Sequence, residues 1–207
     1  MLERFGLWLV EGIGALGYPG IVVLMALESS VFPVPSELVM PPAGFLAAKG
    51  QMNIFVALAC GTVGSLAGAY ANYFVASRVG RWVFVRYGRW VLLTERSLER
   101  TERFFGTHGE IATFVGRLFP VIRHLISIPA GLARMRLDRF LLYTGVGAAI
   151  WCAVLLGIGW LIGEAGAALS REQIEAYTRR AIIALVPVCG VLVAGYVWWH
   201  RRRRGRG

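Results

Sequence analysis

Four charged residues are the natural candidates for chemistry in this chain, because they flank proline-rich breaks in otherwise apolar sequence. Glu28 and Glu37 surround a first break, and Arg117 and Arg123 surround a second. A carboxylate in an apolar environment can take up a proton, whereas an arginine stays charged. The two acids are therefore candidate proton-coupling residues. The two arginines are candidate binding groups for a phosphate, whose oxygens the planar guanidinium matches.

The two breaks are copies of one element. Residues 32–44 and 119–131 align without a gap at an offset of 87, and seven of the thirteen positions are identical. The first copy carries acids and the second carries bases. Paired broken segments in matching places of two halves are typical of the central site of a transporter. The helix-breaking and structural positions are Pro33, Pro35, Pro42, Gly44, Pro120, Pro129 and Gly131.

Three further polar residues lie inside the two copies. Ser36 and Ser127 are candidate lining residues of a shared site. His124 occupies, in the second copy, the position that Glu37 occupies in the first. We interpret His124 as a hydrogen-bonding helper rather than as a proton carrier.

Burial of four charges needs compensation. On insertion scales an acid or an arginine at the centre of a membrane helix costs about 2.5–3.5 kcal/mol. Four such groups cost on the order of 10 kcal/mol, which is comparable to the stability of a whole domain. They are tolerated only if they are paired, hydrated or neutralised. A plain alternative is two internal salt bridges between facing segments with no ligand, and the sequence alone leaves this alternative open.

The composition is that of a membrane protein. The chain has 207 residues, of which 57% are hydrophobic, and its mean hydropathy is +0.59. Three uncharged runs cover residues 54–77, 140–163 and 181–199. Each is long enough to cross a hydrocarbon layer of about 30 Å as a helix. The sequence therefore predicts an all-α integral membrane protein.

The apolar arms beside the breaks are too short to cross. Residues 21–27 and 38–48 flank the first break, and residues 109–118 and 124–133 flank the second. Two such arms form a hairpin that returns to the side from which it came, and its irregular tip must be buried in protein or line a cavity. We predict an inverted repeat of a re-entrant hairpin plus a transmembrane helix, with an extra C-terminal transmembrane helix. The two tips meet near the midplane.

We expect one membrane domain, 1–207, built from consecutive parts. Within the first part, residues 1–16 form an interfacial or partly inserted helix. The parts are the first repeat with its N-terminal helix (1–80), a cytoplasmic amphipathic connection (81–105), the second repeat (106–163), and an outer loop, final helix and basic tail (164–207).

The arginines set the expected orientation. The formal net charge is +10, and most of the basic residues lie at the ends of apolar runs, where they act as topology signals and contact anionic lipids. Seven arginines between Arg78 and Arg103, and the basic tail at 201–206, predict that both segments are cytoplasmic. A nucleic-acid partner is not expected.

Enzymatic motifs are absent. Asp138 is the only aspartate, no His, Cys and carboxylate spacing matches a zinc site, and no Gly-x-Ser-x-Gly elbow occurs. Residues 117–124 loosely resemble part of a membrane phosphatase, but no second Ser-His-bearing block follows. We predict no catalytic residue, no metal site and no cofactor.

The order of these residues resembles the DedA family, also called SNARE-associated or VTT-domain membrane proteins of bacteria. The resemblance covers roughly residues 20–165, and the block Gly-Arg-x-x-Pro-x-x-Arg at 116–123 is its most specific part. The family usually has Gly-Asp where this chain has Gly68-Ala69. The matching positions are Glu28, Pro33, Pro35, Glu37, Pro42 and Gly44, then Gly64, Gly68, Tyr73 and Gly80, then His108, Gly109, Gly116, Arg117, Pro120, Arg123, Pro129, Ala130 and Gly131, and finally Phe140 and Trp151.

The resemblance implies two opposed re-entrant hairpins and movement of lipids across the bilayer. It also implies that Glu28 and Glu37 are the functional acids, and that Arg117 and Arg123 are the functional arginines. We predict a flippase that translocates a phosphate-bearing lipid, either undecaprenyl phosphate or a phospholipid, with proton coupling. The alternatives are a proton-coupled cation antiporter and a non-transporting scaffold. The expected partners are the anionic lipid substrate and membrane lipids, with homo-oligomerisation left open, in the bacterial plasma (inner) membrane with a cytoplasmic C-terminus.

Overall fold

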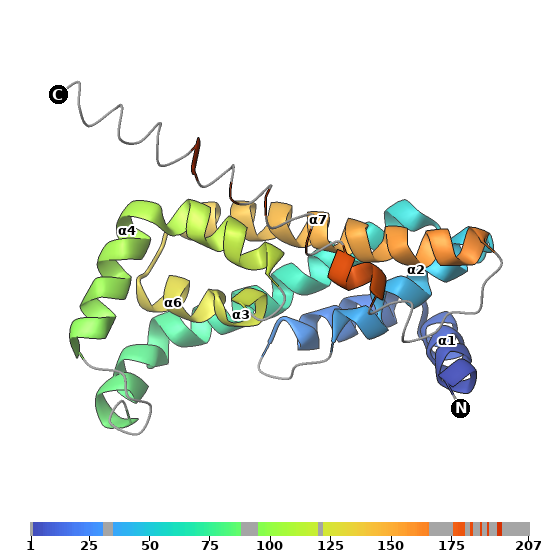
Figure 1. Ribbon diagram of the computed structural model, residues 1–207. Helices are drawn as coiled ribbons and strands as arrows, with labels where there is room; N and C mark the ends of the chain where they lie inside the picture. The colour runs from blue at the N-terminus through green and yellow to red at the C-terminus, as the bar shows by residue number, and fades with distance from the viewer. Residues whose placement is uncertain are drawn as a thin grey trace.

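The computed structural model of the chain is all-helical in its described part, with no strand (Figure 1). The final helix predicted at 181–199, the outer loop and the basic tail lie almost entirely outside the described residues. The structure describes residues 2–30, 35–87, 95–119, 122–165 and 176–180 and five single positions beyond them; side chains are described at 10–30, 35–79, 103–119, 122–165 and 176–180.

Two long helices form the frame. Helix α3 (Ile54–Tyr87) and helix α7 (Leu137–Glu164) run antiparallel, with lengths of about 51 Å and 42 Å at 1.5 Å per residue. The segments Ile54–Val79 and Leu137–Glu164 are long and apolar enough to cross a membrane. The helices predicted at 54–77 and 140–163 are therefore confirmed, and both are candidate membrane spans. Helix α3 continues beyond its apolar part because arginine is a good helix former and no breaker intervenes.

The first hairpin consists of α1 (Leu2–Glu28), a short 3₁₀ turn at Ser36–Leu38 and α2 (Met40–Ala48). Helix α1 is kinked at Gly17, whose φ of 60° and ψ of −156° strongly favour glycine. After the kink, the 11 residues 18–28 span about 16 Å, and the nine residues of α2 span about 14 Å. Each arm thus covers about half of a 30 Å hydrocarbon layer.

The N-terminal prediction needs a correction. Residues 1–16 and 21–27 were expected to be separate segments, but α1 is assigned as one kinked helix from Leu2 to Glu28. Its segment Val10–Glu28 is long and apolar enough to cross a membrane. The kink redirects the chain without ending the helix, because one residue with non-helical dihedral angles interrupts only the local hydrogen bonds.

The second hairpin consists of α4 (Glu95–Leu118), α5 (Ile122–Leu125) and α6 (Ser127–Leu132). The connection 81–105 and the arm 109–118 were predicted as separate segments, which was wrong because α4 runs without a break from Glu95 to Leu118. Gly106 and Gly109 lie between those stretches, and a glycine costs a helix only about 1 kcal/mol without removing a hydrogen-bond donor.

Two of the prolines named as helix-break or structural positions lie inside helices. Pro42 is the third residue of α2 and Pro129 is the third residue of α6. A proline in the first turn of a helix loses no internal hydrogen bond, so both begin an arm rather than break one. The breaks precede them. Pro33 and Pro120 lie outside the described residues.

The two hairpins enter from opposite ends of the molecule. At one end, the backbone N–H of Asn53 donates to the Tyr18 hydroxyl at 2.7 Å, and Lys49 Nζ donates to the Gly163 carbonyl at 3.0 Å. At the other end, the Tyr73 hydroxyl donates to the Met135 carbonyl. Both hairpins therefore have their open ends at the ends of the frame, and their tips meet between (Figure 1).

The second arm of each hairpin packs on the long helix of the other half. A Cβ atom on Gly44 of α2 would lie 2.1 Å from the Leu156 carbonyl oxygen of α7. A Cβ atom on Gly131 of α6, the repeat-equivalent position, would lie 2.5 Å from the Tyr73 carbonyl oxygen of α3. Both positions need glycine because the backbones approach closely.

Glycines also allow close packing on the long helices. Gly64 and Gly68 of α3 lie against the carbonyl groups of α1. On α7, Gly159 and Gly163 contact α2, but a Cβ on Gly157 would meet no atom within 4 Å. Gly157 therefore takes no part in these contacts.

Candidate functional site

The tips of the two hairpins bring Glu28 and Arg123 together. The Glu28 carboxylate is fully buried and the Arg123 side chain is 5% exposed. Oxygen Oε1 of Glu28 accepts a hydrogen bond from Nη2 of Arg123, and Oε2 accepts one from Ser29 Oγ at 2.9 Å. Both carboxylate oxygens are therefore engaged, and the ion pair joins the two hairpins.

Two further side chains hold this contact in place. Nδ1 of His124 lies 3.0 Å from the Glu28 carbonyl oxygen and 3.7 Å from Oε1 of the same residue. The Asn72 side-chain amide of α3 donates to the Ser29 carbonyl oxygen at 2.9 Å. The end of α1 is thus fixed to α3 on one side and to the second hairpin on the other.

Arg117 is a buried cation with no carboxylate partner among the described residues. Its residue is 2% exposed, and its Nη2 donates to Ser127 Oγ at 3.0 Å. Among the described residues, neither Arg117 Nε nor Arg123 Nη1 has a hydrogen-bond partner. A buried charged donor without a partner is costly, so these two N–H groups lack compensation within the described structure.

Trp151 connects Arg123 of the second hairpin to the first hairpin. It lies near the middle of α7 and is fully buried. The Arg123 guanidinium lies 5.2 Å from the centre of the Trp151 ring, within the range of a cation–π contact. The indole N–H of Trp151 donates to Ser36 Oγ at 3.3 Å. Trp151 thus contacts the tips of both hairpins.

The central cluster, defined as Glu28, Ser29, Ser36, Arg117, Arg123, His124, Ser127 and Trp151, has an unbalanced charge. Two arginines face one glutamate, so the cluster carries one net positive charge with His124 neutral. An isolated buried charge costs several kcal/mol. An anion bound between the arginines would balance the charge and use the two unpartnered N–H groups.

Comparison with known proteins identifies the family. The VTT domain pattern matches residues 34–161, which include α2 to α6 and all but the last three residues of α7. The chain belongs to the VTT domain family. This is the DedA family that the sequence resembles, and its members are membrane proteins.

Several relatives of this VTT domain protein have names. A Lactococcus lactis subsp. cremoris protein named alkaline phosphatase-like protein is 33% identical over 161 residues, 75% of each chain. Undecaprenyl phosphate transporter A of Staphylococcus aureus is 28% identical over 200 residues, 95% of this chain and 97% of that protein. The Bacillus subtilis transporter of the same name is 29% identical over 149 residues, 72% and 73% of the two chains. No solved structure matches significantly.

One of the four predicted charges, Glu37, has no interaction partner among the described residues. It is half-buried in the 3₁₀ turn. The ligand-free alternative predicted two internal salt bridges. The described part of the VTT domain protein contains one of them, between Glu28 and Arg123, and no described carboxylate pairs with Arg117.

Sequence reasoning assigned no role to Ser29, Asn72, Trp151 and Glu110. Asn72 is a strongly polar residue within an apolar span, and that signal was available. Ser29 carries no such signal, because serine is common in membrane helices, and Trp151 was named only as a position that matches the family. Glu110 accepts hydrogen bonds from Arg139 and from the Tyr143 hydroxyl, the latter at 3.0 Å. Its spacing of seven residues from Arg117 on one helix could have indicated a shared face.

Substitution of Trp151 tests its double contact. Trp151→Phe keeps an aromatic face under Arg123 but removes the N–H donor to Ser36, and it should cost about 1–2 kcal/mol in unfolding free energy. Trp151→Leu also removes the cation–π contact and should cost at least about 1 kcal/mol more. Thermal unfolding of the purified protein in detergent measures both. Equal midpoints for the two variants would contradict a role for the ring in holding Arg123.

Proposed function

We propose that this protein is a flippase for a phosphate-bearing lipid, either undecaprenyl phosphate or a phospholipid, in the bacterial plasma membrane. The observation that carries the proposal is the buried Arg117, which has no carboxylate partner in the described residues and lies beside the Glu28–Arg123 pair. The relatives named undecaprenyl phosphate transporter A, which span nearly the whole chain in one case, support the same substrate class.

The proposed membrane placement puts the central cluster at mid-depth. Helices α2 and α6, the second arms of the two hairpins, are too short to cross the hydrocarbon layer, so both hairpins would be re-entrant. The two tips meet beside Trp151, near the middle of α7. We place the basic connection before α4 and the basic C-terminus in the cytoplasm, following the distribution of arginines.

In this proposal the head group binds between the two arginines. Arg117 Nε and Arg123 Nη1 can donate to phosphate oxygens while Glu28 keeps its present partners. The Ser127 hydroxyl, which accepts from Arg117, can donate its own proton to a third oxygen. Only the head group needs this polar site, since the lipid tail stays in the hydrocarbon layer.

Proton coupling is proposed through Glu28 and Glu37. A proton on Glu28 would cancel the negative charge that faces Arg123 and would free Nη2 for the phosphate. Proton binding and head-group binding would then favour each other. Glu37 has no partner in the described residues and is the second candidate carrier. The groups that face Glu28 are Arg123, His124, Arg117 and Cys152.

The alternatives agree less well with the central cluster. A cation antiporter would need a free carboxylate at the centre, but both oxygens of Glu28 are engaged and the cluster is net positive. A scaffold without a ligand would leave the unpartnered donor groups of Arg117 and Arg123 unexplained. One relative is named alkaline phosphatase-like protein. Among the described residues, no three His, Cys, Asp or Glu side chains lie close enough together to hold a metal ion.

Arg117 provides the test. Arg117→Ala should weaken binding of farnesyl phosphate, a short polyprenyl phosphate, by about 10- to 100-fold, because a hydrogen bond to a charged group contributes about 1.5–3 kcal/mol. Arg117→Lys should show an intermediate loss, since lysine keeps the charge without the fork. Isothermal titration in detergent measures both affinities. The exposed Arg78 supplies the control variant Arg78→Ala. Unchanged affinity in Arg117→Ala would refute the head-group site.

A further inference from the structure

The buried carboxylate of Glu28 is closed off from the surface of the protein. It is fully buried, and its two oxygens accept hydrogen bonds from Arg123 and from Ser29. A proton from outside therefore reaches it only through a neighbouring group. Proton coupling through Glu28 thus requires a second side chain that carries the proton.

The groups around this carboxylate differ in their ability to pass a proton. Arginine keeps its proton, which excludes Arg117 and Arg123. Ser29 and Cys152 are fully buried, so neither reaches the surface. The His124 side chain is 27% exposed, and histidine gains and loses a proton between about pH 5 and 8. Among the described groups around the carboxylate, only His124 combines an exposed edge with a proton that it can release.

The hydrogen bond of His124 determines which ring nitrogen carries the proton. Nδ1 lies 3.0 Å from the Glu28 carbonyl oxygen, which can only accept a hydrogen bond. The neutral ring therefore carries its proton on Nδ1 and has its lone pair on Nε2. No described residue is hydrogen-bonded to Nε2. The basic nitrogen is thus open to a proton from outside, while the N–H group faces Glu28.

The proton on Nδ1 is already close to the carboxylate. Nδ1 lies 3.7 Å from Oε1 of Glu28. Hydrogen bonds from nitrogen to oxygen span about 2.7–3.2 Å, so a side-chain movement of roughly 0.5–1 Å brings the two atoms together. The step from His124 to Glu28 therefore needs no rearrangement of the hairpins.

The repeat places a side chain that can take up a proton at this position in both halves. At the offset of 87, His124 corresponds to Glu37. Glu37 is half-buried in its 3₁₀ turn. Each hairpin tip therefore carries one partly exposed side chain that can exchange a proton.

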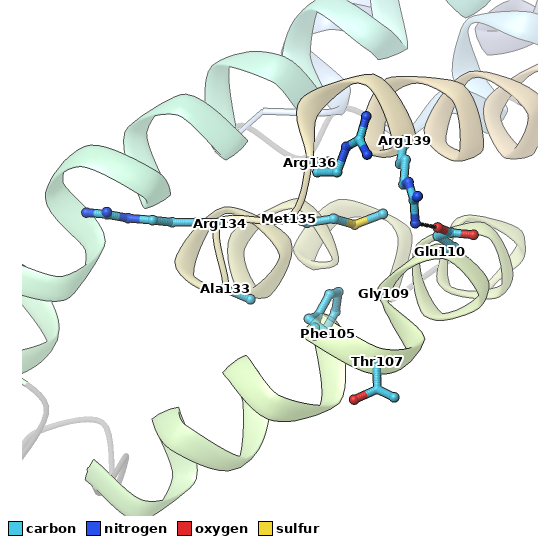
Figure 2. A pocket seen from close by; sticks show the side chains of 10 residues that line it. Phe105, Thr107, Gly109, Glu110, Ala133, Arg134, Met135, Arg136 and Arg139 are labelled. Atoms are coloured by element: carbon cyan, nitrogen blue, oxygen red, sulfur yellow. Dashed lines mark hydrogen bonds and ion pairs between the residues drawn. The ribbon is translucent and has the colours of Figure 1, made fainter. Parts of the chain in front are cut away.

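A route from the open end of the second hairpin is less direct. Figure 2 shows a hollow there, of about 230 Å³, between α4 and the connection from α6 to α7. Its carboxylate, Glu110, accepts hydrogen bonds from Arg139 and Tyr143. None of the residues that line the hollow is a described partner of Glu28. Glu110 also lies seven residues before Arg117 on α4, a rise of about 10 Å. A proton that enters there still needs a further group to reach Glu28.

We infer that His124 is the proton relay between water and Glu28. The inference rests on the proposed proton coupling and names the residue that performs it. The sequence led us to expect a hydrogen-bonding role for His124 and not a proton-carrying one. The position of its N–H group and the exposed edge of its ring add the second role.

The relay has two steps. Nε2 of His124 takes a proton from a hydronium ion, which leaves as water, and the ring becomes an imidazolium. Nδ1 then gives its proton to Oε1 of Glu28, which leaves a neutral carboxylic acid and a neutral ring with its proton on Nε2. The new O–H group can donate back to Nδ1, and the reverse steps release the proton.

The surroundings favour transfer over storage of the proton on the ring. The charged and titratable groups that face Glu28, besides His124, are Arg123 of α5, Arg117 of α4 and Cys152 of α7. Two arginines near the ring disfavour an imidazolium. The charged ring is therefore a short-lived intermediate, and Glu28 is the group that keeps the proton.

Infrared spectroscopy after a sudden drop in pH measures how fast Glu28 in the full chain takes up its proton. The C=O band of a protonated carboxyl group reports the reaction, and its loss in Glu28→Gln assigns it. His124→Gln keeps an N–H donor but cannot carry a proton, so the band should rise at least about 10-fold more slowly. His124→Gly should be slow as well, and free imidazole should restore its rate. A purely structural role would not respond to imidazole.

His108→Gln is the matched control. His108 is also half-buried, but it stacks on Phe104 and lies nine residues before Arg117 on α4. This variant should take up the proton at the wild-type rate. Thermal unfolding shows which variants are folded, and either His124→Gln or His124→Gly is sufficient for the test.

Two results would overturn the relay: a wild-type rate in His124→Gln, or a slow rate in His124→Gly that imidazole does not restore. A wild-type protein without a Glu28 band would overturn the relay together with the coupling through Glu28. The head-group site is tested separately by Arg117→Ala, so its failure is distinguishable from that of the relay.

Discussion

Arg123→Ala is expected to destabilise the protein and abolish lipid transport. The substitution leaves Glu28 fully buried without its cation, and loss of one partner of a buried pair costs about 3–5 kcal/mol. For a chain of this length, this lowers the thermal midpoint by roughly 6–20 °C. It also removes one of the two unpartnered donors proposed for the phosphate. Thermal unfolding in detergent and transport in proteoliposomes measure the two effects.

A double variant separates stability from function at this site. Glu28→Gln in the Arg123→Ala background removes the uncompensated charge, so about half or more of the lost stability should return. Transport should stay absent, because the arginine is still missing. Recovery of transport in the double variant would show that Arg123 serves only to neutralise Glu28, which is the ligand-free alternative.

Gly159→Ala is expected to have the second large effect. A Cβ at this position would lie 1.9 Å from the Pro41 carbonyl oxygen, and the clash is with backbone of the facing helix, which has no rotamer to relieve it. Helices α2 and α7 must therefore separate. Overpacking of this kind costs about 3 kcal/mol or more, and the thermal midpoint should fall by roughly 6–12 °C.

Gly157→Ala is the control for this prediction on the same helix. A Cβ there meets no atom within 4 Å, and alanine is a better helix former than glycine by about 1 kcal/mol. Its thermal midpoint should be unchanged or higher. If Gly159→Ala were as stable as Gly157→Ala, the close contact between the first hairpin and α7 would be wrong.

The long helices could be predicted from the sequence because hydrophobic length is a local property. An uncharged run of 24 residues can cross a membrane whatever surrounds it, and both described runs do form helices of that kind. The repeat is also visible in the second arms, since α2 and α6 begin at the repeat-equivalent positions Met40 and Ser127.

Helix ends and kinks were predicted less well. Glycine at Gly17 kinks α1, whereas Gly106 and Gly109 lie within the continuous α4. The same residue type thus has opposite outcomes, because tertiary packing decides which backbone conformation a glycine adopts. A prediction that places a helix boundary both at Gly17 and at Gly106–Gly109 can therefore not be right in both places.

The composition of the candidate site could be predicted, but its pairing could not. Four charges beside two breaks indicated a common centre, and Glu28, Arg117 and Arg123 do lie together. Which acid pairs with which arginine depends on how the tips meet. From the sequence, Glu28 and Glu37 are equal candidates for pairing with an arginine. In the structure Glu28, the last residue of α1, is the one that reaches Arg123.

The central claim is that a lipid phosphate crosses the membrane through the site formed by Arg117 and Arg123. The most direct measurement is the rate at which polyprenyl phosphate moves between leaflets of proteoliposomes containing the full chain. The account predicts that wild-type protein accelerates this movement above the rate in protein-free vesicles, and that Arg117→Ala, folded and inserted equally well, returns it to that background. Equal rates for wild type and Arg117→Ala would contradict the account.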